Sequence, residues 1–183
     1  MEKLKFNDFN SNIHLPELLS WKKRFGDSQG YKNIEKYIFA ENNSSSFKEI
    51  GFNSILNPKT GSQRHSIVAT NNQEIVGVVS FDLMQENSNK PCSYIKYVFI
   101  NPAYQNKGLG KEILYNSIKA ETKNNPNLKT FLANIRLSNK TSQKLFASLG
   151  FKPTNEKNSS KLVQLSATLK QIEESFESSK QLS

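Results

Sequence analysis

Tyr94 to Lys123 reads YIKYVFINPAYQNKGLGKEILYNSIKAETK, and this stretch decides the fold of the chain. Aromatic and β-branched residues dominate Tyr94–Ile100, which favours a strand. Asn101-Pro102 ends it, because proline lacks an N–H and restricts the residue before it. Apolar residues then recur at helical spacing from Leu109 to Ile118. The order strand, glycine turn, helix predicts an anion site at the uncovered amide groups of the helix start.

Two common phosphate-binding patterns do not fit this turn. A Walker A loop needs a glycine where Gln105 stands and a Ser or Thr where Glu112 follows Lys111. A Rossmann fingerprint needs a third glycine where Ile113 stands. It also needs an acidic ribose partner at the position of Thr130. Both patterns therefore fail at two positions each.

A third pattern fits. Gln105-Asn106-Lys107-Gly108-Leu109-Gly110 resembles the Q/R-x-x-G-x-G/A pyrophosphate loop of the GNAT N-acetyltransferase superfamily. The preceding Ile100–Tyr104 is similar to the V-x-P-x-[YW] lead-in of that family. Further on, Asn139–Phe151 (NKTSQKLFASLGF) resembles its second motif, N-x-x-[AS]-x-x-x-[YF]-x-x-x-G-F. On these two motifs, in this order, the stretch Ile67–Phe151 is identified as a member of the family.

The resemblance implies an α/β (α+β) fold in one domain spanning residues 1–183. We expect a mixed, mostly antiparallel sheet of about six to seven strands flanked by helices, with strands splayed at the cofactor site. A variable acceptor-side region is expected at about residues 10–62, a cofactor-binding core at about 65–152, and a last strand and tail at about 153–183.

The local patterns agree with this order. We expect strands over Lys3–Phe9, His65–Thr70, Glu74–Leu83, Leu128–Ile135 and Lys161–Thr168, with a hairpin turn at residues 71–73. Helical spacing is seen over residues 15–25 and 31–38, in a helix capped by Asn139, and in a short helix or tail after residue 168. Residues 47–56 are ambiguous. Gly77 indicates either a close backbone approach or a bulge, and Gly150 is placed to end the helix before it.

The resemblance also implies that acetyl-CoA is bound as co-substrate between the splayed strands. Backbone groups of Val98 and Ile100 would pair with its pantetheine amides, and the loop amides would hold its diphosphate. The predicted cofactor-binding residues are Val98, Phe99, Ile100, Gln105, Asn106, Lys107, Gly108, Leu109, Gly110, Lys111, Asn139, Ser142 and Phe146.

Two catalytic positions depart from the common family pattern. Phe146 stands where many members carry a proton-donating tyrosine, so Ser142, one turn earlier, becomes the candidate donor to the departing thiolate. The alternative for Ser142 is a small residue that allows helix–sheet packing. Tyr94 stands where a carboxylate base is frequent, and tyrosine is a poor base near neutral pH. The amine is then deprotonated through water or with help from Asp82 or Glu86.

The resulting prediction is an acyl-CoA-dependent N-acyltransferase that acts by direct attack of a primary amine in a ternary complex. The alternative is an acetyl-CoA-binding module with little catalysis. The N-x-x-S variant weakly favours a peptide or protein N-terminus as acceptor, and a small amine stays open. The aromatic residues that either line the acceptor site or simply fill the core are Trp21, Phe25, Tyr31 and Phe52.

Composition bears on membrane insertion, cellular compartment, metal binding and partners. The 183 residues carry a net charge of +9 and 36% hydrophobic residues, without an apolar run of the roughly 20 residues that a membrane helix needs. A single cysteine, Cys92, and the start of the chain, which lacks a signal peptide, favour a cytoplasmic protein. His14 and His65 do not suggest a metal site, so no metal is expected. The lysines are dispersed, which makes nucleic acid an unlikely partner; a monomer or homodimer is expected.

Overall fold

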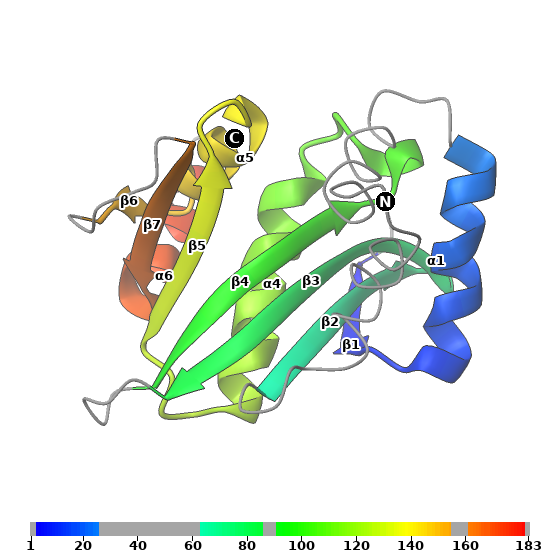
Figure 1. Cartoon of the computed structure of the whole chain (residues 1–183), viewed down its shortest axis with the longest axis horizontal. Helices are drawn as coiled ribbons and strands as arrows, with labels where there is room; N and C mark the ends of the chain where they lie inside the picture. Colours follow the sequence, from blue (N-terminus) through cyan, green and yellow to red (C-terminus); the bar gives the residue numbers. More distant parts are fainter. Residues whose placement is uncertain (1–2, 26–62, 86–90, 155–160, 182–183) are drawn as a thin grey trace.

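The computed structural model describes residues 3–25, 63–85, 91–154 and 161–181 (Figure 1). Several sequence-based expectations lie outside the described residues: the helix over 31–38, the ambiguous segment 47–56, and the roles suggested for Tyr31, Phe52 and Glu86. Phe25 ends a described helix, but its side chain is not described.

The sheet has seven strands among the described residues, in the order β1-β2-β3-β4-β5-β7-β6. All neighbouring pairs are antiparallel except β4 and β5, which are parallel. This confirms the predicted mixed, mostly antiparallel sheet. The strands are β1 (Lys5–Asp8), β2 (Gln63–Asn71), β3 (Glu74–Gln85), β4 (Pro91–Ile100), β5 (Thr130–Arg136), β6 (Lys152–Pro153) and β7 (Leu162–Thr168).

Helices cover both faces of the sheet (Figure 1). They are α1 (Ser11–Phe25), the short 3₁₀ helix η2 (Pro102–Tyr104), α4 (Leu109–Asn124), α5 (Lys140–Ala147) and α6 (Leu169–Lys180). The larger core joins α4, α5 and α6 to one face, where Ile113, Phe131 and Ile172 are fully buried. A smaller core joins α1 to the opposite face through Leu18 and Trp21. No helix in the described ranges is long and apolar enough to span a membrane.

The β2–β3 hairpin turns without glycine. Asn72 and Gln73 both have positive φ, 46° and 71°, as a two-residue type I′ turn requires. Further along β3, Gly77 lies against β4, and a Cβ built on it would meet the Phe99 carbonyl oxygen at 2.8 Å. The first of the two interpretations of Gly77, close approach of another backbone, is therefore confirmed; the bulge lies just before it, where the register shifts after Ala69.

Strands β4 and β5 pair only at their beginnings. Cys92, Ser93 and Tyr94 pair with Thr130, Phe131 and Leu132. Beyond Tyr94, β4 continues to Ile100 and β5 to Arg136 without registered pairing. The predicted splay thus begins at Tyr94, and both strands end at the same end of the sheet because they are parallel.

Candidate cofactor and acyl-transfer site

The open edge of β4 carries unpaired strand positions. The Asn101 N–H donates to the Val76 carbonyl on β3 (2.8 Å), so the backbone groups of Asn101 face β3. Because backbone direction alternates along a strand, those of Ile100 and Val98 face the gap toward β5. The Ile100 carbonyl accepts a hydrogen bond from the Gln105 side-chain amide (3.0 Å). An extended, amide-containing ligand can add to this edge as a further strand does.

The loop after β4 presents uncovered amides. Asn106 and Gly108 have φ of 60° and 76°, and Gly108 is the N-cap of α4 without a side-chain capping bond. A Cβ on Gly108 would meet no heavy atom within 4 Å, so the space beside it is open. The first N–H groups of an α-helix have no partner within the helix. Together with the helix dipole, this makes the start of α4 suited to a diphosphate.

The two lysines of the loop have different surroundings. Lys107 is exposed, with its Nζ 5.1 Å from the centre of the Tyr104 ring. The Lys111 Nζ instead donates to the Ser175 carbonyl on α6 (3.4 Å). Burial lowers the Lys111 pKa. Lys107 therefore remains available to an anion, while Lys111 offers its backbone amide and its side chain joins α4 to α6.

Helix α5 faces the same end of the sheet. The Asn139 side chain accepts from the Ser142 N–H (3.1 Å), which confirms its predicted capping role. Ser142 is half-buried, and its hydroxyl has no hydrogen bond to another described residue. The helix ends in a turn where Gly150 has φ of 81° and the Phe151 N–H donates to the Phe146 carbonyl (3.2 Å), as predicted for the cap.

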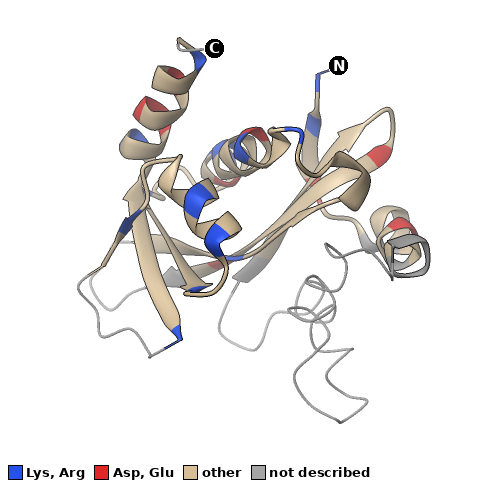
Figure 2. Cartoon of the chain, turned by 90° about the horizontal axis from the view of Figure 1, so that it is seen from above, with Lys and Arg blue, Asp and Glu red and all other residues tan. Residues whose placement is uncertain are grey.

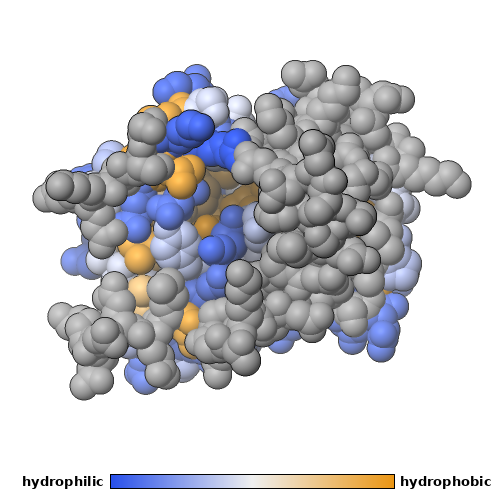
Figure 3. Space-filling view, viewed as in Figure 1, coloured by the Kyte–Doolittle hydropathy of each residue, from blue (hydrophilic) through white to orange (hydrophobic). Residues whose placement is uncertain are grey.

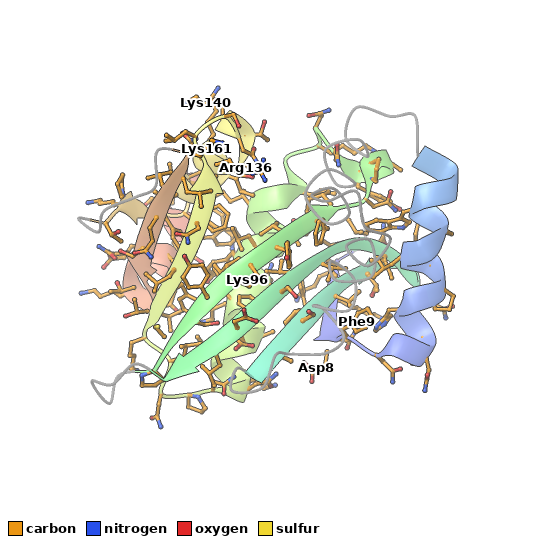
Figure 4. The ribbon with its side chains drawn as sticks, viewed as in Figure 1. Asp8, Phe9, Lys96, Arg136, Lys140 and Lys161 are labelled. Atoms are coloured by element: carbon orange, nitrogen blue, oxygen red, sulfur yellow. The ribbon has the colours of Figure 1, made fainter. Side chains whose placement is uncertain are left out.

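A charged pair lies on the sheet face away from α4, where the splay begins. Tyr94 and Asp82 are direct cross-strand partners, and the Lys96 Nζ is 3.6 Å from Asp82 Oδ2. The same Nζ lies 5.3 Å from the centre of the Tyr94 ring. The register between β3 and β4 shifts beside Lys96, so this residue is the extra one of a β-bulge. Figure 4 shows Lys96 near the middle of this face.

The rim of the open edge on the β5 side is basic. Arg136, Lys140 and Lys161 lie together where β5 ends, α5 begins and β7 begins (Figure 4). Seen from this end, Lys and Arg colour α5 and the strands beside it (Figure 2). Figure 3 views the molecule in the direction of Figure 1. In the part not covered in grey, hydrophobic residues lie at the bottom of a recess and hydrophilic residues surround it. An amphipathic polyanion suits such a recess.

Comparison with known proteins agrees with this geometry. Residues 31–151 match the model of the acetyltransferase (GNAT) family. The chain belongs to the GNAT acetyltransferase family. No curated protein sequence matches it.

Solved GNAT structures share the fold at low identity. One is an aminoglycoside N(6′)-acetyltransferase from Legionella pneumophila (TM-score 0.67, 17% identity, 95% of this chain and 97% of that one). Another is an acetyltransferase from Thermus thermophilus (TM-score 0.66, 15% identity, 92% and 98%). A third is PaiA N-acetyltransferase from Thermoplasma acidophilum in complex with coenzyme A (TM-score 0.60, 14% identity, 91% and 99%).

Some aromatic residues named in the sequence analysis have buried side chains. Phe99 is buried on the α1 face and stacks on Tyr97, with ring centres 5.6 Å apart. Phe146 is 4% exposed and makes an edge-to-face contact with Phe151. Trp21 is 3% exposed in the smaller core, which favours the packing role over the acceptor-lining one. All three aromatic residues therefore make packing contacts, and cofactor contact by Phe99 and Phe146 stays a prediction.

The sequence does not predict the contacts that join residues 101–104, before the glycine loop, to the beginning of β3. Asn101 is fully buried and its Nδ2 donates to the Ile75 carbonyl (3.0 Å). Its Oδ1 accepts from the Ala103 N–H (3.0 Å). The Tyr104 hydroxyl donates to Glu74 Oε2 (2.7 Å). The sequence signals were Asn101-Pro102 as a strand end and Ile100–Tyr104 as the family lead-in; nothing local pointed to Glu74.

Proposed function

We propose that this GNAT protein transfers an acetyl group from acetyl-CoA to a primary amine. One observation carries the proposal: the edge of β4 opens at Tyr94 and leads directly to an uncapped helix start with open space at Gly108. The edge suits the pantetheine amides and the helix start suits the diphosphate. Backbone groups of Val98 and Ile100, and amides of residues 106–111, are the assigned contacts.

The acceptor amine approaches from the sheet face that carries Tyr94. Asp82 on that face is our candidate for taking the proton from the ammonium, directly or through a water molecule, in place of Tyr94. Tyr94 is unsuited to that step because its hydroxyl oxygen is buried and tyrosine titrates near pH 10. The Lys96 ammonium lies beside this carboxylate, with its Nζ 3.6 Å from Asp82 Oδ2.

The neutral amine then attacks the thioester carbonyl, forming the N–C bond as the C–S bond breaks. The Val98 N–H is assigned to the developing oxyanion. The departing thiolate accepts a hydrogen bond from the Ser142 hydroxyl and takes up the second proton of the amine nitrogen, while Asp82 releases the first proton to solvent. No acyl-enzyme forms. Holding both reactants in line supplies much of the acceleration.

The test is thiol release from acetyl-CoA with a panel of amines, polyamines, amino acids and peptides, alongside calorimetry with coenzyme A. Turnover on any amine supports the transferase. Binding without turnover on every acceptor supports the second candidate, a cofactor-binding module, which is favoured by a phenylalanine, Phe146, at the usual proton-donor position. Absence of coenzyme A binding would reject both.

The loop assignment has its own check. Gly108→Val places a branched side chain at a position with φ of 76° and beside the open amides. We expect the affinity for coenzyme A to fall at least tenfold, by roughly the 1–2 kcal/mol of the left-handed strain together with steric cover. Unchanged affinity would remove this loop from the site.

A further inference from the structure

The β2–β3 hairpin holds the loop that follows β4. Glu74 is the first residue of β3, directly after the two-residue turn. We propose that Glu74 is a positioning residue for the cofactor: through Tyr104 it fixes the loop whose amides take the diphosphate. This inference rests on the proposed function and assigns a role to a residue that does not touch the cofactor.

The contact is direct and well formed. The Tyr104 hydroxyl donates to Glu74 Oε2 at 2.7 Å, while Glu74 Oε1 lies 3.5 Å from the Asn101 Nδ2. Tyr104 ends the short helix η2, and Gln105, the first residue of the diphosphate loop, follows it. One carboxylate therefore holds both ends of η2, and η2 joins the strand to the loop.

The next residues of β3 reinforce the same junction. Asn101 bonds to the Ile75 carbonyl with its side chain and to the Val76 carbonyl with its N–H. The Ile75 N–H donates to Glu17 Oε1 of α1 (2.7 Å). The beginning of β3 thus contacts the loop on one side and α1 on the other.

The chemistry of the pair suits a fixed anchor. An ionised carboxylate accepts a shorter and stronger hydrogen bond than a neutral acceptor. The hydrogen bond to Glu74 raises the Tyr104 pKa, so the phenol stays protonated and remains a donor. The anchored ring also lies beneath Lys107, with the Nζ 5.1 Å from its centre.

Positioning matters here because the loop contains strained backbone. Asn106 has φ of 60°, a left-handed conformation that non-glycine residues adopt at a cost. Such a conformation persists only when neighbouring contacts hold it. Without the Glu74–Tyr104 bond, the loop amides are expected to sample orientations that do not converge on one anion.

The experiment is a double-mutant cycle read by calorimetry with coenzyme A. Tyr104→Phe keeps the ring and removes the donor; Glu74→Ala removes the acceptor. We expect each to raise the Kd about tenfold, and the double variant to raise it no further, because both single changes break one bond. Glu74→Gln retains an acceptor oxygen and is expected to stay within about threefold of wild type.

Tyr115→Phe is the matched control, because Tyr115 stacks on Phe176 of α6, with ring centres 3.7 Å apart, and takes no part in the Glu74–Tyr104 bond. Thermal unfolding of every variant is measured alongside. In the acetyl transfer assay the KM for acetyl-CoA should rise while kcat and the KM for the amine stay unchanged. A lower melting temperature without a change in Kd would indicate a purely structural contact and overturn the positioning role.

Two further outcomes separate the inference from the proposed function. Wild-type protein that binds coenzyme A, with Tyr104→Phe and Glu74→Ala binding equally well, would overturn the positioning role alone. Additive effects in the double variant would also overturn it, because the residues would then act independently. Wild-type protein that fails to bind coenzyme A would reject the proposed function and this inference with it.

Discussion

Ser142 is the proposed hydrogen-bond donor to the departing thiolate. It sits in the first turn of α5, half-buried, with its N–H fixed by Asn139. Phe146, one turn later, has no proton to offer. Ser142→Ala is therefore expected to lower kcat by about tenfold to a hundredfold, as loss of a hydrogen bond to a charged thiolate would, and to lower coenzyme A affinity less.

Ser148→Ala is the control for this change, since Ser148 is the C-cap of the same helix and its hydroxyl donates to the Leu145 carbonyl (2.7 Å). Steady-state kinetics of both variants decide the matter. A Ser142→Ala enzyme with wild-type kcat would make Ser142 a packing residue.

Asp82 is the proposed acceptor of the proton from the ammonium group, and its substitution tests that role. Asp82→Asn keeps the shape and removes the base, so we expect kcat to fall about a hundredfold. Lys96→Met is the paired control, because it breaks the same ion pair and leaves the carboxylate in place. Equal losses in both variants would show that the ion pair, not the carboxylate, matters.

The sequence predicts those site residues whose roles depend on their close neighbours along the chain. Residues 105–111 and Asn139 act through backbone conformation and capping, which depend on a few neighbouring residues, and the motifs placed them correctly in a loop and at a helix start. The destination of the Lys111 side chain was not predictable. Its partner, the Ser175 carbonyl, belongs to a helix sixty-four residues away in sequence. The contact of Tyr104 with Glu74, thirty residues away, was missed for the same reason.

At the scale of elements, the approach of β3 to β4 depends on one glycine. A Cβ on Gly77 would lie 2.8 Å from the Phe99 carbonyl and 3.2 Å from Ile100 and Ile113 side chains. Gly77→Ala must therefore push β4 outward, and we expect it to destabilise the fold by about 1–3 kcal/mol. Because β4 carries the open edge, coenzyme A affinity should fall as well.

Gly110→Ala provides the contrast within α4. A Cβ there meets only Leu145 side-chain atoms, at 3.6 and 3.7 Å, which is ordinary contact. Alanine also favours a helix over glycine by roughly 0.5–1 kcal/mol. Urea unfolding should show Gly110→Ala at or above wild-type stability; if Gly77→Ala matched it, the close approach of β3 and β4 would carry no energetic cost.

Three elements meet at His65, on the face of the sheet that carries α4. Its Nδ1 lies 2.5 Å from Glu121 Oε2 of α4, and its Nε2 lies 2.8 Å from Asp8 Oδ1 of β1. The hydrogen bond to Glu121 is the main cause of a raised His65 pKa, with Asp8 contributing and burial opposing. The folded protein therefore holds this proton to higher pH than the unfolded chain does.

The difference between the folded and unfolded pKa of His65 makes the free energy of unfolding depend on pH. The contribution of His65 is complete below the unfolded histidine pKa of about 6.5 and is lost as pH rises through the folded value. His65→Gln should therefore cost about 1–3 kcal/mol near pH 6 and progressively less toward pH 9. Urea unfolding of both proteins across this range measures it. A difference that stays constant with pH would contradict the assignment of the proton to His65.

The elements themselves were largely predictable, because strand and helix periods are local properties. The hairpin of Asn72 and Gln73 and the cap at Gly150 follow from turn chemistry. For the tail after residue 168, the sequence predicts a short helix or a frayed end. It forms the twelve-residue α6, because Ile172 and Phe176 are buried and Thr168 makes a capping box with Gln171. The capping box is a local signal, whereas the burial of Ile172 and Phe176 in the larger core depends on the tertiary fold.

Positive charge is distributed unevenly over the molecule. Between Thr122 and Ile172 the chain has nine Lys or Arg residues and one acidic residue, so nearly all of its net charge of +9 belongs to this segment. In the described part, the segment forms β5, α5, β6 and β7, the side of the sheet beyond the splay. The lysines are dispersed along the sequence, as the composition indicates. In space, Arg136, Lys140 and Lys161 gather at the rim of the open edge (Figure 4).

This arrangement favours a polyanion at the end of the sheet where the cofactor is proposed to bind. Coenzyme A carries several phosphate charges, and surface charges interact over roughly the Debye length of 8–10 Å at physiological salt. The Kd for coenzyme A should therefore rise steadily between about 0.05 and 0.5 M NaCl. Lys140→Gln and Lys161→Gln should each weaken binding about 1.5- to 5-fold at low salt and flatten that dependence.

Lys170→Gln removes the same charge from a different place, since Lys170 lies on α6, 85% exposed and paired with Glu174. If the rim acts locally, this variant keeps wild-type affinity and salt dependence. If net charge alone attracts the cofactor, all three variants weaken binding equally. Calorimetric titrations of the three proteins across the salt series distinguish a local anion site from a general attraction by the basic side of the molecule.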